Sequence, residues 1–103
     1  MPTITKYHAK PGRSEQVAAL LASHWELLHN EGFATDQRAF LMRDPDEPDL
    51  FVEVFEWKEE EGPDKAWNHQ EIAELWEQIQ SLCENDITPE YYDMVPAIYM
   101  GGG

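Results

Sequence analysis

The chain has 103 residues, of which 42% are hydrophobic, and this is enough for one domain with a hydrophobic core. Its 21 Asp and Glu residues outnumber 7 Lys and Arg residues, for a formal charge of −14. Nucleic-acid binding needs a basic surface, and an anionic membrane would repel so acidic a chain, so neither partner is expected. The single cysteine, Cys83, excludes an intramolecular disulfide framework. With no bilayer-length apolar segment and no signal-peptide core, we expect a cytoplasmic location.

The first third of the chain predicts a strand followed by a helix. Residues 2–8 contain threonines and isolated hydrophobic residues, which favour an extended strand. A Lys-Pro-Gly turn comes next, and Ser14 is placed as the N-cap of a helix. The helix is predicted to end at Gly32, a residue suited to a left-handed cap. Its apolar positions have helical spacing: Val17, Leu20, Leu21, His24 and Leu28.

Two further strands and a second helix are predicted in the middle of the chain. Residues 36–43 contain a short apolar segment, and residues 50–57 contain a longer one rich in β-branched and aromatic side chains. Residues 65–84 are predicted to form one helix, with Pro63 placed in its first turn. Its apolar stripe consists of Ile72, Leu75, Trp76, Ile79, Leu82 and Cys83.

A last strand is predicted over residues 91–100, with Pro96 indicating an edge or a bulge, and residues 101–103 are expected to be a flexible tail. The order strand, helix, strand, strand, helix, strand predicts an α+β fold, a ferredoxin-like βαββαβ sandwich spanning residues 1–100 as a single domain. Its four-stranded antiparallel sheet should have both helices on one face.

The strand at 50–57 has apolar side chains on both faces, since Leu50, Val52 and Val54 alternate with Phe51 and other aromatic residues. The helices can cover only one face of the sheet. A second copy of the chain, packed sheet against sheet, would cover the other, so we expect a homodimer.

Several segments resemble the antibiotic biosynthesis monooxygenase family of the dimeric α/β-barrel superfamily. They are FVEVFEW at 51–57, AWNH at 66–69, LWE at 75–77 and LCE at 82–84, with the KPG turn at 10–12 and the HW pair at 24–25. The resemblance covers nearly the whole chain and implies a dimeric barrel with a ligand cavity between helices and sheet. Relatives include cofactor-free monooxygenases, haem-degrading enzymes, isomerases and members without an assigned activity.

The haem-degrading relatives combine an asparagine of the first strand with a tryptophan and a histidine about three helical turns apart. Here the first strand has no asparagine, and Trp67 and His69 are only two residues apart, so they cannot face each other on a helix. Haem degradation is therefore not expected. The four histidines are scattered and no glycine-rich phosphate loop is present, so we expect no metal site and no cofactor.

Three residues are candidate acid–base groups. His24 and His69 share the apolar stripes of the two predicted helices, and the resemblance implies that both line the cavity, where either could act as a base. Glu53 shares a strand face with Phe51 and Phe55, where burial would favour proton transfer. Each histidine could instead be a hydrogen-bonded core residue, and Glu53 could form a cross-strand or interfacial ion pair.

A planar organic ligand would need aromatic walls. The candidates are Trp25, Trp57, Trp76 and Tyr7, each of which could equally be a core or interface residue. The resemblance implies a cofactor-independent monooxygenase acting on a small aromatic or polyketide-like compound. The alternatives are a non-catalytic ligand-binding dimer and a proton-transfer isomerase that uses the same pocket.

Overall fold

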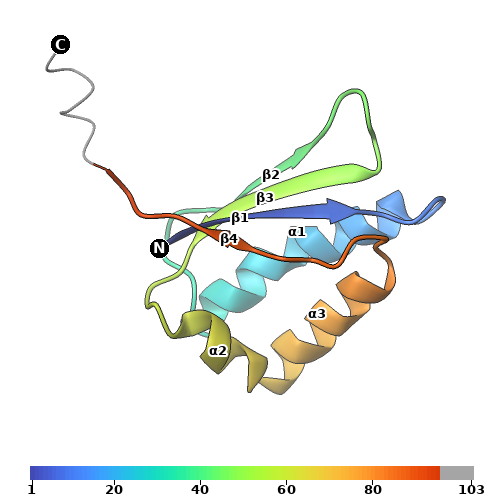
Figure 1. Ribbon diagram of the computed structural model, residues 1–103. Helices are drawn as coiled ribbons and strands as arrows, with labels where there is room; N and C mark the ends of the chain where they lie inside the picture. Colours follow the sequence, from blue (N-terminus) through green and yellow to red (C-terminus); the bar gives the residue numbers. More distant parts are fainter. Residues whose placement is uncertain (96–103) are drawn as a thin grey trace, which may run out of the picture.

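The computed structural model describes residues 1–95 and consists of a sheet with helices packed on one face (Figure 1). Its elements, in chain order, are β1 (Pro2–His8), α1 (Ser14–Asn30), β2 (Phe40–Arg43), β3 (Leu50–Glu56), α2 (Gly62–Trp67), α3 (Gln70–Ser81) and β4 (Glu90–Tyr91). The predicted α+β, ferredoxin-like order is confirmed, although the second helical unit consists of two helices.

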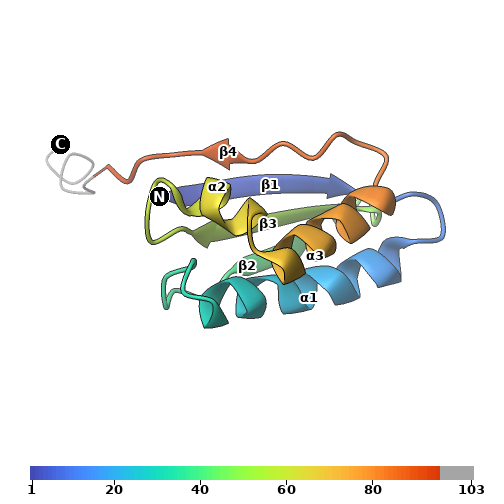
Figure 2. The ribbon, with the colours of Figure 1, turned by 90° about the horizontal axis from the view of Figure 1, so that it is seen from below.

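The four strands are all antiparallel and lie in the order β2-β3-β1-β4. The central pair runs in register along its whole length, from Pro2 opposite Glu56 to His8 opposite Leu50. Figures 1 and 2 show α1 and α3 side by side on the same face of this sheet. The split βαββαβ topology places two helices against one face of the sheet, and within residues 1–95 the opposite face has no helical layer.

The faces of β3 differ as the alternation of the sequence predicts. Phe51, Glu53 and Phe55 are buried beneath the helices, whereas Leu50, Val52 and Val54 are only partly buried. Strand side chains point alternately to the two faces of a sheet, so one face of β3 belongs to the core. The core residues come from every layer: Tyr7, Ala9, Val17, Leu21, Trp25, Leu28, Ala34, Phe51, Phe55, Trp57, Ala66, Ile72, Ile79 and Cys83.

The face of the sheet away from the helices is apolar. Phe40 of β2 lies opposite Val54, which in turn lies opposite Ile4 of β1. Met42 lies opposite Val52 on the same face, and Phe40 and Met42 are 61% and 47% exposed. No element within residues 1–95 covers these side chains.

The prediction of a single helix over residues 65–84 is wrong, because the helix is interrupted at residues 68–69. His69 has an extended backbone (φ −91°, ψ 117°) and precedes the first residue of α3. The break lets α2 lie over Trp57 while α3 turns Ile72 toward the core. Gly62 makes that close approach possible, since a Cβ there would be 2.7 Å from Cε3 of Trp57.

Other local predictions fared differently. The left-handed Gly32 after α1 is confirmed, with φ +82°. Ser14 is not the N-cap: it is the first residue of α1, and its hydroxyl donates instead to the carboxylate of Asp49. The last strand is shorter than predicted within the described residues, since β4 spans only Glu90–Tyr91. The predicted strand residues 96–100 and the tail 101–103 lie outside the described residues.

Candidate functional site

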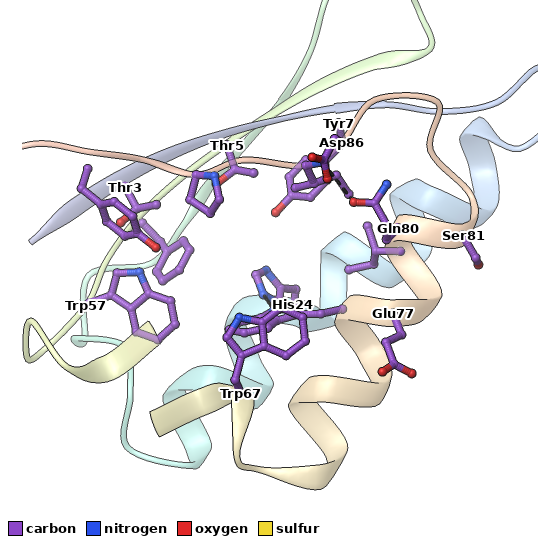
Figure 3. Close-up of a pocket in the computed structure, with 16 residues that line it drawn as sticks. Thr3, Thr5, Tyr7, His24, Trp57, Trp67, Glu77, Gln80, Ser81 and Asp86 are labelled. Atoms are coloured by element: carbon purple, nitrogen blue, oxygen red, sulfur yellow. Dashed lines mark hydrogen bonds between the residues drawn. The ribbon is translucent and has the colours of Figure 1, made fainter. Parts of the chain in front are cut away.

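A cavity of about 600 Å³ lies between the helices and the inner face of the sheet (Figure 3). Its wall is formed by β1, β3, α1, α3, the end of α2 and the segment that leads into β4. The lining residues are Thr3, Thr5, Tyr7, His24, Phe55, Trp57, Trp67, Trp76, Glu77, Ile79, Gln80, Ser81, Asp86, Ile87, Pro89 and Tyr91. The wall therefore offers an incoming ligand no Lys or Arg side chain from the described part of the chain.

Four side chains from four different elements form a hydrogen-bond chain beside the cavity. Tyr7 of β1 donates its hydroxyl to Oε1 of Glu53 at 2.9 Å. Nδ1 of His24, on α1, lies 3.0 and 2.9 Å from the two oxygens of the same carboxyl. Trp76 of α3 donates its indole N–H to Nε2 of His24 at 2.8 Å. The chain therefore runs from the sheet through α1 to α3.

The indole of Trp76 determines which nitrogen of His24 holds the proton. An indole N–H can only donate, so Nε2 of His24 must offer a lone pair. His24 is then the neutral tautomer with its proton on Nδ1, which donates to Glu53. Glu53 in turn receives two donors, the hydroxyl of Tyr7 and the Nδ1–H of His24, which is the arrangement that a buried carboxylate requires.

The carboxyl of Glu53 is 1% exposed and has no Lys or Arg partner among the described residues. Its negative charge affects the neighbouring phenol. Burial first, and then the charge and hydrogen bond of Glu53, raise the pKa of Tyr7 well above its usual value. Tyr7 therefore stays protonated and acts as a hydrogen-bond donor at neutral pH.

Aromatic side chains form much of the remaining wall. Trp67 and Trp76 meet edge to face with ring centroids 4.6 Å apart, and Phe55 lies 5.1 Å from Trp57. Trp57 and Trp76 also meet edge to face, at 6.4 Å. Offset and edge-on contacts hold such rings in defined orientations. Aromatic walls of this kind are suited to flat organic molecules.

The structure brings most of the predicted site residues together. His24, Tyr7, Trp57 and Trp76 line the cavity, and Glu53 lies directly behind Tyr7 and His24.

Six non-aromatic polar residues that were not predicted as site residues also line the cavity, namely Thr3, Thr5, Glu77, Gln80, Ser81 and Asp86. The two threonines could have been found, because they alternate with Tyr7 along β1 and so must share its face. Gln80 has no comparable signal, since its helix position is next to the apolar stripe rather than on it.

Two predicted site residues lie elsewhere. The prediction that His69 lines the cavity wall is wrong: His69 precedes α3, with Nε2 3.1 Å from a carboxylate oxygen of Glu31 and its ring 6.3 Å from Phe33. Trp25 stacks on His29 at 4.6 Å beneath the guanidinium of Arg38 and does not line the cavity. The helix break accounts for His69, since it removes that residue from the predicted stripe.

Residues 1–95 contain no group of three or more His, Cys, Asp or Glu side chains placed to hold a metal ion. In the same part of the chain, every helix is too short or too polar to cross a membrane.

No family model and no curated protein matches the chain. Solved structures do match it. An antibiotic biosynthesis monooxygenase aligns with a TM-score of 0.77 and 23% identity, over 92% of this chain and 98% of its own. Rv0793 from Mycobacterium tuberculosis aligns with a TM-score of 0.75 and 13% identity, over 93% and 96%. A conserved protein from Methanosarcina mazei Go1 aligns with a TM-score of 0.73 and 18% identity, over 88% of each chain.

At these identities the likeness establishes the fold. The chain has the fold of an antibiotic biosynthesis monooxygenase, and the resemblance seen in the sequence is confirmed at that level.

The tautomer of His24 can be tested by nitrogen-15 NMR of the imidazole rings. We expect His24 to be neutral with its proton on Nδ1, because Trp76 donates to Nε2. Trp76→Phe removes that donor, so Nε2 becomes free to accept a proton beside the Glu53 carboxylate. The Nε2 resonance should therefore move in the variant, because its lone pair loses the indole donor. Trp67→Phe, which removes no hydrogen bond to His24, is the matched control, and an Nε2–H tautomer in the parent protein would contradict the assignment.

Tyr7→Phe should alter the alkaline stability of the protein. The folded state raises the pKa of Tyr7 above its unfolded value near 10, so the folded protein holds the proton more tightly. That stabilisation is complete below about pH 10 and is lost as the pH rises through the folded pKa. At neutral pH the variant should be less stable by about 1–3 kcal/mol, since Glu53 loses a donor. In urea melts, the difference in unfolding free energy between the variant and the parent should shrink above about pH 10. A difference that stays constant with pH would contradict the raised pKa of Tyr7.

Proposed function

We propose that the protein is a cofactor-independent monooxygenase-like enzyme that acts on a small aromatic compound. The observation that supports this most is the His24–Glu53 pair, held 2.9 Å apart at the wall of an aromatic cavity. A base next to a flat apolar pocket suits the deprotonation of an activated aromatic substrate. The shared fold with an antibiotic biosynthesis monooxygenase supports the reaction class by analogy.

In this proposal His24 is the base and Glu53 is the positioning residue. The substrate displaces the indole N–H of Trp76 from Nε2 of His24, and Nε2 takes the proton. The resulting imidazolium lies beside a carboxylate that is otherwise an isolated buried anion, so proton transfer creates a compensated ion pair. Glu53 thus favours the protonated form of the base, as the carboxylate does in other carboxylate–histidine pairs.

The deprotonated substrate supplies the electrons for the oxygen step. A ring CH₂ group acidified by a carbonyl across the ring loses one proton to His24. The carbanion reduces O₂ to form a carbon-bound peroxide, which takes the proton back from the His24 imidazolium. Loss of water from this peroxide leaves a new carbonyl group. One oxygen atom enters the product and the other, with the two hydrogens of the CH₂ group, leaves as water. No external reductant is needed.

A second candidate is a non-catalytic protein that binds the same kind of ligand. The observation that favours it is that the hydrogen-bond chain closes on itself, because Trp76 occupies the lone pair of His24 that a base would use. A fully satisfied buried network is also what a purely structural cluster would look like. Turnover measurements therefore separate the two candidates.

We also propose that the protein forms a homodimer through the outer face of the sheet. Two of the side chains there, Phe40 and Met42, come from an edge strand, share the face of Val52 and Val54, and are 61% and 47% exposed. Exposed apolar surface of this kind is costly in a monomer. A two-fold dimer would bury the same patch on both copies.

His24→Ala should lower turnover by about two to four orders of magnitude if His24 is the base. Oxygen uptake with anthrone-like compounds, in the presence of a chelator and without added flavin or haem, measures this. Glu53→Gln should lower turnover as well, because the amide cannot stabilise an imidazolium by charge.

His69→Ala is the matched control, since this histidine lies outside the cavity, and its turnover should equal that of the parent. Loss of activity in His69→Ala with retention in His24→Ala would reverse the assignment. Ligand binding without oxygen uptake would favour the binding protein. Exchange of substrate hydrogen with solvent in the absence of oxygen uptake would indicate an isomerase.

The double substitution Phe40→Glu with Met42→Glu should dissociate the proposed dimer. Both side chains are exposed in the single chain, so the fold of each protomer should survive. Sedimentation should report a mass near 12.0 kDa for the variant and twice that for the parent. Ala22→Glu, on the exposed side of α1, is the control and should stay dimeric. A parent protein that sediments as a monomer would refute the interface.

A further inference from the structure

Two buried polar atoms in the wall of the cavity have no hydrogen-bond partner among the described residues. They are the hydroxyl oxygen of Thr3 and the indole nitrogen of Trp57, on side chains that are 1% and 3% exposed. Nearly all buried polar groups in proteins are paired, and an unpaired one destabilises the fold. Two such groups in one cavity wall need an explanation that the hydrogen-bond chain around Glu53 does not supply.

The two groups lie at the same end of the cavity. Thr3 lies opposite Phe55, and the backbone ladder continues past that pair to Trp57, whose N–H bonds to the carbonyl of Met1. Thr3 and Trp57 are therefore diagonal neighbours on the inner face, a spacing of about 7 Å in antiparallel sheets. Figure 3 shows both side chains at one end, with Tyr7, Gln80 and Asp86 at the other and His24 between them.

The indole of Trp57 is fixed rather than free to seek a partner elsewhere. The backbone of Gly62 lies against the ring beside Cε3, so closely that a Cβ would be 2.7 Å away. Phe55 and Phe33 contact the same side chain, with centroids at 5.1 and 6.5 Å. A donor held in this way is preorganised for whatever accepts its hydrogen.

We propose that Thr3 and Trp57 together bind a hydrogen-bond-accepting oxygen of the ligand, a carbonyl oxygen on a planar aromatic skeleton. An indole N–H only donates, so its partner must be an acceptor, and the threonine hydroxyl can donate to the same oxygen. This inference rests on the proposed aromatic-ligand pocket and adds the polar group that the ligand presents. It also fixes the orientation, with the oxygen at the Thr3 end and the ring system extending toward His24.

The cavity wall next to Thr3 is held by a short strand. Tyr91 lies opposite Thr3, is 45% exposed, and belongs to a strand that pairs with β1 through only two residues. Few backbone hydrogen bonds oppose its displacement, so local opening of β4 is inexpensive compared with global unfolding. Displacement of Tyr91 would open the cavity beside Thr3 while leaving the β1–β3 pairing in place.

The test compares 9-fluorenone with fluorene, which share a skeleton and differ by a carbonyl in place of a methylene. Calorimetric or NMR titration of the full chain should show tighter binding of the ketone by roughly tenfold or more, because only the ketone pairs the two donors. Thr3→Val and Trp57→Phe should each reduce this preference, and together they should abolish it. Trp25→Phe, which removes a buried indole N–H that is unpaired among the described residues and does not line the cavity, should retain it.

Stability measurements separate a ligand-binding role from a structural one. Thr3→Val removes an unpaired buried hydroxyl, so the ligand-free variant should melt at the same temperature as the parent or higher. A lower melting temperature with an unchanged ketone preference would mean that the hydroxyl serves the fold and would overturn the proposal. Equal binding of the two compounds by the parent would overturn it too. If neither compound binds, the aromatic pocket itself fails, and the proposed function fails with it.

Discussion

The structure depends on one buried carboxylate. Glu53 lies at the centre of the inner face of β3, 1% exposed, where an ionised group is tolerated only with hydrogen-bond donors around it. Tyr7 from the neighbouring strand and His24 from the helix above supply those donors at 2.9 Å. The pairing of β1 with β3 and the position of α1 over the sheet are thus tied to a single side chain. An apolar residue there would pack more simply, which argues that the charge is retained for a reason other than stability.

The helix interruption between α2 and α3 determines which side chains line the cavity. A continuous helix would have presented His69 and Trp76 on one stripe. With the break, α2 packs over Trp57 through Gly62, and α3 brings Trp76 to within 2.8 Å of His24. The extended His69 lies outside the cavity, near Glu31. Because His69 is not helical, the cavity wall contains the indole of Trp76 and no second histidine among its described residues. That indole determines which nitrogen of His24 holds the proton.

Much of this could be predicted from the sequence, and the failures have identifiable causes. Period-two alternation correctly assigned the faces of β3, and it placed Glu53 on the same buried face as Phe51 and Phe55. Helical spacing placed His24 correctly on the buried side of α1. The same spacing misplaced His69, because the segment around Asn68 and His69 has no proline or glycine that would indicate the end of a helix. Trp25 is buried as expected but stacks on His29 instead of lining the cavity, a choice among core positions that periodicity cannot make.

Which hydrogen-bond donors and acceptors pair with one another could not be predicted from the sequence. This pairing distinguishes the two ends of the cavity. Around Glu53 the donors and acceptors are paired, and the donor-only indole of Trp76 leaves His24 no alternative to the Nδ1–H tautomer. At the Thr3 end two donors have no partner among the described residues. A ligand could accept hydrogen bonds at the Thr3 end and displace the indole of Trp76 from His24 at the Glu53 end. The hydrogen bonds gained at the Thr3 end would then offset the one lost between Trp76 and His24. Binding and exposure of the base would then be one event, so the base would be free only when a ligand is in place.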